Sequence, residues 1–284
     1  MRIVCLSNMS DGPGFVVRRV LAAFPSAKLL QIRAVPRRST LRRKLRGLAR
    51  GAWIRKLEQR CYYQGYFARG LKQLDERLYG PEGPPPVAAI KQIASTEVNL
   101  STAATCVASL RPDVLLVAGA PILRPSIFTI PRLAAINVHF GIAPWYRGEH
   151  TLFWPLYYGD EKNVGVTVHL IDKGIDTGRM LAQGFVGVAA DDDEWAIEAK
   201  AARTAADVVV KVLQRGEFEP SWQPTRAGRG RVYNYSDRHV WHDVRLARRR
   251  RQGLTATAPR QIDYCRPAVS DESIEAELLA MAAL

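Results

Sequence analysis

Apolar and polar positions follow one another along most of the chain in a way that predicts strands and helices in turn. Continuous apolar runs, several rich in β-branched residues, predict strands at residues 2–6, 28–33, 114–118, 134–140, 164–171 and 180–188. Helical spacing predicts helices at residues 15–24, 101–110 (with Ser101 as N-cap), 125–130, 151–158 and 193–213. This order indicates an α/β fold, a Rossmann-like and mostly parallel sheet with helices on both faces.

Two segments depart from this pattern. A basic amphipathic insertion covers about residues 34–80, and a Pro-rich connector at 81–86 ends it. Its apolar residues lie near helical spacing in two groups: Leu41, Leu45, Leu48, Ala52 and either Trp53 or Leu57, then Tyr62, Tyr63, Tyr66, Phe67, Leu71 and Leu74. Beyond residue 215 the pattern weakens, with a last helix at 273–284. We therefore expect a catalytic domain at 1–215 and a small C-terminal extension at 216–284.

Most of the positive charge lies in these two segments. The chain has a net charge of +14, of which residues 33–60 supply +10 and Arg245 with residues 248–251 supply +5. The body is therefore close to neutral. The Arg-rich helices have three interpretations: they lie on an anionic membrane surface, they bind the phosphates of tRNA, or they pack on the body with a solvated Arg face.

The composition excludes several classes of protein. Hydrophobic residues make up 47% and charged residues 24% of the chain, which is ordinary for a globular protein. The longest apolar run, residues 114–123, is interrupted by Gly119 and Pro121 and is too short to span a membrane. The first residues lack a signal-peptide core. Four separated cysteines without a CxxC pair favour free thiols. We expect a cytoplasmic protein, at most peripheral to the inner face of the membrane.

Polar residues that could carry chemistry stand at the ends of two predicted strands. Asn137 and His139 flank Val138, so period-2 alternation places both side chains on one face. An acidic glycine loop at residues 171–178 follows the next strand and contains Asp176. Open α/β sheets bind ligands at strand ends. Taken singly, such motifs are common in turns.

In combination, four motifs resemble the signature of the folate-dependent formyltransferases. They are AINVH (135–139), PWYRG (144–148), GVTVH (165–169) and GIDTG (174–178). That family includes glycinamide ribonucleotide formyltransferase, the catalytic domain of methionyl-tRNA formyltransferase, and sugar N-formyltransferases. The resemblance is dense over residues 112–213. It departs at residues 141–144, where Gly-Ile-Ala-Pro replaces the Ser-Leu-Leu-Pro of many relatives.

The resemblance implies a catalytic set of Asn137, His139 and Asp176. In formyl transfer from 10-formyltetrahydrofolate, Asn137 and His139 could donate hydrogen bonds to the oxyanion of a tetrahedral intermediate. Asp176 could orient His139 and accept the proton of the attacking amine. No metal is implied, because the histidines are not spaced as ligands. We expect His169, at the end of a predicted strand, to have a structural role.

The resemblance also implies binding positions. Those for the folate are Gly119, Pro121, Ile122, Leu123, Asp172, Gly174 and Ile175. Those for the acceptor are Ser7, Ser10 and Gly12 in the first turn, and Arg147. Purine-pathway relatives hold a phosphate at this turn, and Asp11 would repel one here.

The identity of the acceptor stays open among several classes. The first candidate is a primary amine on a small or carrier-linked acceptor, such as an amino sugar. Methionyl-tRNA is second, because residues 214–284 are too few and too irregular for the β-barrel that grips tRNA in that enzyme. A formyltetrahydrofolate hydrolase and a non-catalytic basic RNA- or membrane-binding protein remain further alternatives.

Overall fold

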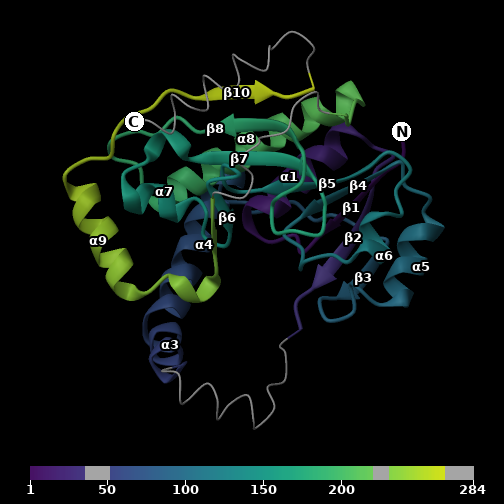
Figure 1. Cartoon of the computed structure of the whole chain (residues 1–284). Coiled ribbons are helices and arrows are strands. Elements are labelled where there is room, and N and C mark those ends of the chain that lie inside the picture. The colour runs from purple at the N-terminus through teal and green to yellow at the C-terminus, as the bar shows by residue number, and fades with distance from the viewer. Residues whose placement is uncertain (36–51, 220–229, 266–284) are drawn as a thin grey trace.

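One eight-stranded sheet organises the molecule, and the computed structural model describes residues 1–35, 52–219 and 230–265 of the chain (Figure 1). The strand order across the sheet is β10-β8-β7-β5-β4-β1-β2-β3. The parallel part consists of β1 (Ile3–Ser7), β2 (Lys28–Arg33), β3 (Lys91–Ala94), β4 (Val114–Ala118) and β5 (Ala134–His139). The antiparallel part consists of β7 (Gly165–Leu170), β8 (Met180–Phe185) and β10 (Arg260–Asp263).

The two faces of the parallel strands form two separate cores. Every residue of β1 and β4 is buried, as expected for central parallel strands covered on both sides. Alternate residues such as Cys5 and Leu116 face the long helices α1 (Asp11–Ala23) and α8 (Glu194–Arg215). Their neighbours, such as Leu6 and Leu115, face α5 (Ser101–Ser109) and α6 (Pro125–Phe128). This arrangement confirms the predicted α/β class with helices on both faces.

Several element boundaries differ from the sequence-based predictions. Helix α1 begins at Asp11, four residues early, and so takes in part of the turn that the glycines predicted. Ser101 is the first residue of α5, and Leu100 holds the N-cap position, so Ser101 does not cap the helix. The short edge strand β3 carries only one buried residue, Ile93, which explains why no apolar run marked it.

The described part of the insertion packs on the body. It comprises α3 (Ala52–Glu58), a π-helical turn (Gln59–Tyr63) and α4 (Gln64–Tyr79). Tyr63 and Leu74 are almost completely buried, and α4 lies against α8 and α1 (Figure 1). The apolar stripe of α4 therefore faces the protein. Of the predicted first group, Leu41, Leu45 and Leu48 lie outside the described residues, and the remainder falls in α3, where Trp53 and Leu57 are exposed.

The C-terminal segment returns to the body. Strand β9 (Arg231–Tyr233) pairs with β6 (Tyr146–Gly148), and α9 (Val240–Arg251) packs against α7 (Phe153–Tyr158). Two 3-10 turns, Glu161–Asn163 and Tyr235–Asp237, complete the described elements. Strand β10 then joins the sheet edge beside β8. The described part of the predicted extension thus completes the main sheet, while the predicted helix at 273–284 lies outside it.

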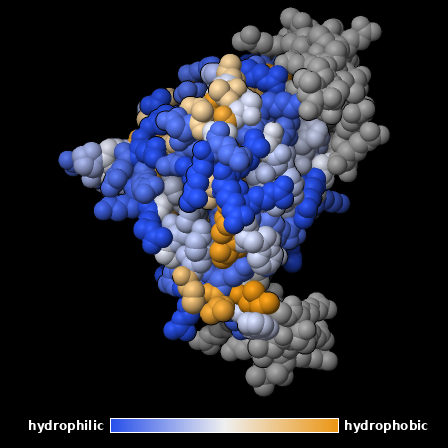
Figure 2. Space-filling model, turned by 90° about the vertical axis from the view of Figure 1, so that its left-hand side faces the viewer, coloured by the Kyte–Doolittle hydropathy of each residue, from blue (hydrophilic) through white to orange (hydrophobic). Residues whose placement is uncertain are grey.

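The surface formed by α3 and α9 carries exposed apolar side chains among charged ones (Figure 2). They are Trp53, Ile54, Leu57, Trp241 and Val244. Within the described ranges, none of the helices has the length and apolarity that crossing a membrane requires.

Candidate active site

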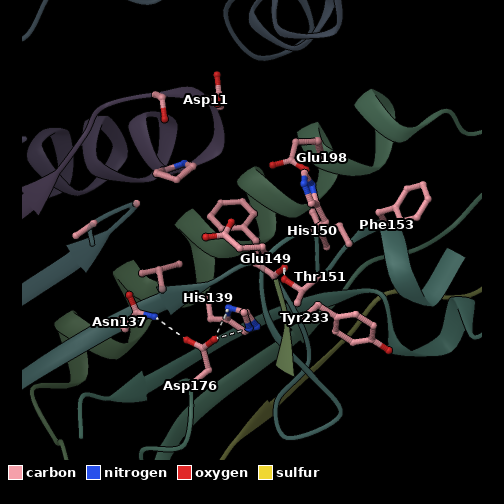
Figure 3. Close-up of a pocket in the computed structure, with 18 of the residues that line it drawn as sticks. Asp11, Asn137, His139, Glu149, His150, Thr151, Phe153, Asp176, Glu198 and Tyr233 are labelled. Carbon is pink, nitrogen blue, oxygen red and sulfur yellow. Dashed lines mark hydrogen bonds and ion pairs between the residues drawn. The ribbon is translucent and has the colours of Figure 1, made fainter. Parts of the chain in front are cut away.

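Three polar side chains converge beside the end of β5. Asn137 and His139 lie on one face of this strand, as period-2 alternation predicts. Asp176 reaches them from the loop after β7 (Figure 3). Its Oδ1 lies 3.4 Å from the amide nitrogen of Asn137, and its Oδ2 lies 3.5 Å from Nδ1 of His139. The predicted amide, imidazole and carboxylate are therefore neighbours.

The imidazole of His139 lies between two acceptors. Its Nε2 is 2.8 Å from the carbonyl oxygen of Tyr146, and its Nδ1 faces the carboxylate of Asp176. Since both neighbours can only accept hydrogen bonds, the arrangement favours a ring that carries a proton on each nitrogen. The ring is 6% exposed, so Asp176 supplies its charge partner inside the protein. His139 is thus fixed in position and orientation.

The local backbone explains why Asp176 sits in an Asp-Thr-Gly sequence. Asp176 has a φ of 50°, in the left-handed region that Asp tolerates better than most residues. A Cβ on Gly178 would lie 1.6 Å from the carbonyl oxygen of Leu170, so only glycine fits there. The backbone N–H of Gly148 donates to Oδ2 of Asp176 at 2.9 Å and ties the loop to β6.

The environment of Asp176 keeps its carboxylate ionised. Burial by itself would raise the pKa of this group, but the charge of His139 and the contacts with His169 and Gly148 hold the pKa well below its usual value. A carboxylate of such low basicity suits charge pairing and orientation of the imidazole. It accepts a proton from a strongly acidic donor only, such as an amine that has already begun to bond to a carbonyl carbon.

His169, which the sequence suggested was structural, belongs to this cluster. Its Nδ1 lies 2.7 Å from the carbonyl oxygen of Leu170, which fixes the proton on that nitrogen. Its Nε2 lies 3.2 Å from the amide nitrogen of Asn137 and 3.5 Å from Asp176 Oδ1. Asn137 and His169 are opposite each other in the pairing of β5 with β7. The sequence did not reveal that His169 belongs to the cluster, because the pattern within one strand does not show which residue of another strand it pairs with.

A small slot of about 110 Å³ adjoins this cluster on one side. All but one of the predicted folate-binding residues line it: Pro121, Ile122, Leu123, Asp172, Gly174 and Ile175. Ile122 is 69% exposed and Ile175 39% exposed, so the slot offers uncovered apolar surface next to Asn137 and Asp176. A flat ring with polar edges suits such a slot. Asp172 closes its own loop, with Oδ1 accepting from Gly174 N and the Thr177 hydroxyl.

A larger cavity of about 530 Å³ opens on the other side of the cluster. Asn137, His139 and Asp176 form its floor, together with Gly119, the remaining residue of the predicted folate set. Residues from α4, α8 and the C-terminal segment form its walls, among them Phe67, Trp195 and Tyr233. The insertion and the C-terminal segment thus contribute directly to the site, which sequence reasoning had not anticipated.

Of the residues predicted to bind the acceptor, the structure brings only Ser10 to this cavity. Ser7 is completely buried, and its Oγ accepts from the backbone of Met9. Gly12 packs against the ring of Phe140. Arg147 is 8% exposed and donates to the carbonyl oxygens of Ile175 and Gly230, so it fastens two loops behind the cavity. Ser7, Gly12 and Arg147 thus lie outside the lining of the cavity and support the segments around it.

No group of three or more His, Cys, Asp or Glu side chains with metal-binding geometry occurs in the described ranges of the chain.

The fold and this cluster define an α/β protein with an Asn–His–Asp site at the end of an inner strand of a mixed sheet. Residues 73–213 match the family model described as Formyl transferase, and this part of the chain belongs to that family. The match includes all three residues of the cluster.

Two curated relatives are methionyl-tRNA formyltransferases. That of Thermosynechococcus vestitus is 42% identical over 108 residues, which cover 38% of this chain and 32% of the relative. That of Caldanaerobacter subterraneus is 38% identical over 118 residues, covering 40% of this chain and 38% of the relative. The chain thus matches between a third and two fifths of the length of these relatives.

Two solved structures share the fold over more of the chain. A sugar N-formyltransferase from Shewanella has a TM-score of 0.52 at 14% identity, covering 95% of this chain and 99% of its own. A 4-N formyltransferase from Francisella tularensis has a TM-score of 0.51 at 13% identity, covering 83% of this chain and 77% of its own. At these identities the likeness concerns the fold.

Proposed function

We propose that the protein transfers the formyl group of 10-formyltetrahydrofolate to a primary amine of a small or carrier-linked acceptor. The observation that carries this proposal is the position of the Asn137–His139–Asp176 cluster, which lies between a small apolar slot and a larger polar cavity. A transferase for two substrates needs such a junction, with the reacting carbonyl over the cluster and one substrate on each side.

On the donor side, the slot between Ile122 and Ile175 would hold the flat pterin ring of the folate. Residues 120–123, the loop that contains Asp172 and Asp176, and the side chains of Asn137 and His169 surround the slot. These groups would fix the orientation of the ring and therefore the place of the formyl carbonyl. Closure of the slot by Ile175 would also keep water from the carbonyl, which favours transfer over hydrolysis.

In the reaction, the acceptor nitrogen forms a bond to the formyl carbon, and the carbonyl oxygen becomes an oxyanion. Asn137 would donate to this oxygen after giving up its long 3.4 Å contact with Asp176. The protonated imidazole of His139, oriented by Asp176, would supply positive charge close to the oxyanion. Asp176, directly or through His139, takes the proton that the amine loses. The intermediate then collapses, the bond from the formyl carbon to the folate nitrogen breaks, and that nitrogen recovers the proton.

For the acceptor, we propose an amino sugar ahead of methionyl-tRNA. The cavity has walls of aromatic and carboxylate side chains, the kind of surface that takes a sugar ring through stacking and hydroxyl hydrogen bonds. Methionyl-tRNA is kept as the second candidate, because two methionyl-tRNA formyltransferases match part of the chain. The basic groups at residues 37–50, which suggested contact with RNA or a membrane, lie outside the described residues.

The test is mass spectrometry of acceptors incubated with the protein and 10-formyltetrahydrofolate. The panel contains nucleotide-linked amino sugars and initiator methionyl-tRNA. We expect an amino sugar to gain one formyl group, and Asn137→Ala to lower kcat by about 10²–10³-fold, the usual cost of one oxyanion donor. Gln214→Ala, on the exposed side of α8, serves as the control with unchanged kcat.

Three results would contradict the proposal in different ways. Formylation of methionyl-tRNA alone would reverse the order of acceptors. Release of formate without an acceptor, abolished in Asn137→Ala, would make the protein a hydrolase. Binding of RNA or lipid vesicles that is unchanged by His139→Ala, without any turnover of formyltetrahydrofolate, would leave a binding protein on an enzyme fold.

A further inference from the structure

The larger cavity is acidic in a protein that is strongly basic as a whole. No Lys or Arg is among its lining residues, whereas five carboxylate residues line it: Asp11, Glu149, Asp176, Glu194 and Glu198. Figure 3 labels four of them, Asp11, Glu149, Asp176 and Glu198. The chain as a whole has a net charge of +14. The charge that a ligand meets inside the cavity is therefore opposite in sign to the charge of the molecule.

Two of these carboxylates are neutralised by the protein itself. Asp176 faces His139. Glu194 receives two hydrogen bonds from Arg238, at 2.6 and 2.8 Å, and one from the hydroxyl of Tyr66 at 2.6 Å. These two groups have no charge left to offer a ligand.

Glu198 differs from them. It is partly buried, and within residues 1–35, 52–219 and 230–265 its carboxyl forms no hydrogen bond or ion pair with the protein. Burial first, and then the neighbouring carboxylates Glu194 and Asp11, raise the pKa of Glu198 to about 8. Burial and Asp75 likewise raise the pKa of Asp11 to about 6. Arg238, which is already paired with Glu194, offsets this rise only in part. Among the described residues, Glu198 therefore lacks a positive partner of its own at the place where α1, α4 and α8 meet.

The surrounding walls are aromatic. Phe67 of α4 lies edge-on to Trp195 of α8 with ring centroids 6.1 Å apart, and it stacks against His150 at 5.9 Å and Tyr63 at 5.6 Å. Phe67, Trp195 and His150 line the cavity. These rings exclude water from this end of the cavity, so the wall strengthens the attraction of the nearby carboxylates for a positive group.

We propose that this end of the cavity binds a second protonated amine on the acceptor, held by Glu198 and Asp11, while the first amine reacts over Asn137 and His139. The inference rests on the proposed formyl transfer and narrows its acceptor to diamino compounds. It also excludes acceptors whose phosphate would enter the cavity. The first turn of α1 could otherwise receive an anion, but Asp11 occupies that turn and places its negative charge there.

The experiment compares three matched amino sugars that differ in one group. The probes are methyl 2-amino-2-deoxyglucoside, its 6-amino-6-deoxy derivative and its 6-phosphate. Affinities are measured by calorimetry at pH 7 with the full chain, without formyl donor. We expect the diamino sugar to bind about tenfold more tightly than the monoamine, the usual gain from a charge-assisted hydrogen bond, and the phosphate to bind more weakly than both.

Two variants connect this preference to the residues. Glu198→Gln and Asp11→Asn should each reduce the preference for the diamino sugar, and the double variant should abolish it. Asp207→Asn removes an equal charge from the exposed side of the same helix α8 and should leave the preference at the wild-type ratio. Thermal unfolding of each variant shows that it is folded.

Equal affinities for the three sugars, preference for the phosphate, or no binding of any of them would overturn the inference. So would a double variant that keeps the full preference. Failure of the proposed function gives a different result: the diamino sugar binds with the expected preference, but no formyl group is transferred to it from 10-formyltetrahydrofolate. That result would support the acidic amine site and contradict the formyl transfer.

Discussion

At the scale of single residues, the site depends on how one carboxylate is shared. Asp176 lies within 3.5 Å of Asn137, His139 and His169 and accepts the backbone N–H of Gly148. A neutral amide of the same shape could keep some of these contacts but not the charge. The functions of Asp176 in orientation and in charge balance can therefore be separated by substitution.

We expect Asp176→Asn to lower kcat by about 10²–10⁴-fold with a much smaller effect on folate binding, because a general base and charge partner is lost. Steady-state kinetics and equilibrium binding of tetrahydrofolate would measure the two effects. An equal loss in both would instead mean that Asp176 only shapes the slot.

The same substitution makes a prediction about acid stability. Since the pKa of Asp176 is lower in the folded than in the unfolded protein, its contribution to stability is complete above the usual carboxyl pKa and disappears as the pH falls through the folded value. We expect wild type to exceed Asp176→Asn by about 1–3 kcal/mol at pH 7, the cost of losing a buried hydrogen-bonded charge. The difference should shrink as the pH falls below about 4. Urea unfolding at a series of pH values measures it.

Glu198 should show the opposite dependence. Its pKa of about 8 exceeds that of an ordinary Glu, so the folded protein holds this proton more tightly and loses stability as the pH rises from about 4.5 to 8. We expect Glu198→Gln to be more stable than wild type by at least about 1 kcal/mol at pH 8, with little difference at pH 4. Asp207→Asn is the control. A difference between wild type and Glu198→Gln that stays constant with pH would contradict the assigned environment.

At the scale of secondary-structure elements, one guanidinium holds together a wall of the larger cavity. Arg238, 1% exposed, pairs with Glu194 of α8 and Asp243 of α9 and lies 3.8 Å from the ring centroid of Phe153 in α7. From the insertion, the hydroxyl of Tyr66 donates to Glu194 and that of Tyr63 donates to Asp243. The insertion, α8 and the C-terminal segment are therefore fastened at a single point beside the cavity.

We expect Arg238→Met to destabilise the protein by about 3–5 kcal/mol, because Glu194 and Asp243 lose their buried partner. The triple variant with Glu194→Gln and Asp243→Asn should recover much of this loss, since no unpaired charge remains. Urea unfolding of the wild type and the two variants tests both statements. An effect of Arg238→Met below about 1 kcal/mol would show that the cluster contributes little.

The sequence predicted the elements whose burial shows in local patterns. Strands β1, β4 and β5 are continuous apolar runs, and α8 has a capping Asp193 and a terminal Gly216, so these were visible. Strands β6 and β9 have three residues each and exist because they pair with each other across more than 80 positions of the chain. No local pattern encodes such a pairing. For the same reason the sequence did not show that Asn137 and His169 meet, or that Phe67 lines the site.

At the scale of the whole molecule, the C-terminal segment closes the sheet. Strand β10 covers the edge of β8, and the hydroxyl of Tyr264 donates to Oε1 of Gln183 at 2.6 Å. Gln183 in turn donates to the carbonyl of Ala143 and to the hydroxyl of Thr167. A buried chain of hydrogen bonds thus runs from the sheet edge to the loop that follows the catalytic strand.

Tyr264→Phe should cost about 1–3 kcal/mol of stability, because it leaves the buried amide oxygen of Gln183 without a donor. Hydrogen exchange should also become faster at Ala143, whose backbone N–H bonds to Thr167. Thermal unfolding and amide exchange measure the two effects. Tyr158→Phe, at a half-exposed tyrosine away from this network, is the comparison. Unchanged exchange at Ala143 would show that β10 and the catalytic loop are independent.

The fastening of three distant segments at Arg238 has a consequence for how such proteins diversify. The small slot is made by strand ends and the loops that follow them, whereas the insertion and the C-terminal segment contribute walls of the larger cavity. If the insertion and the C-terminal segment were replaced together, with Arg238 and its carboxylate partners kept, the same formyl transfer would act on a different acceptor. A protein in which only one of these segments was exchanged would have a buried charge without its partner. We therefore expect the insertion and the C-terminal segment to be inherited together.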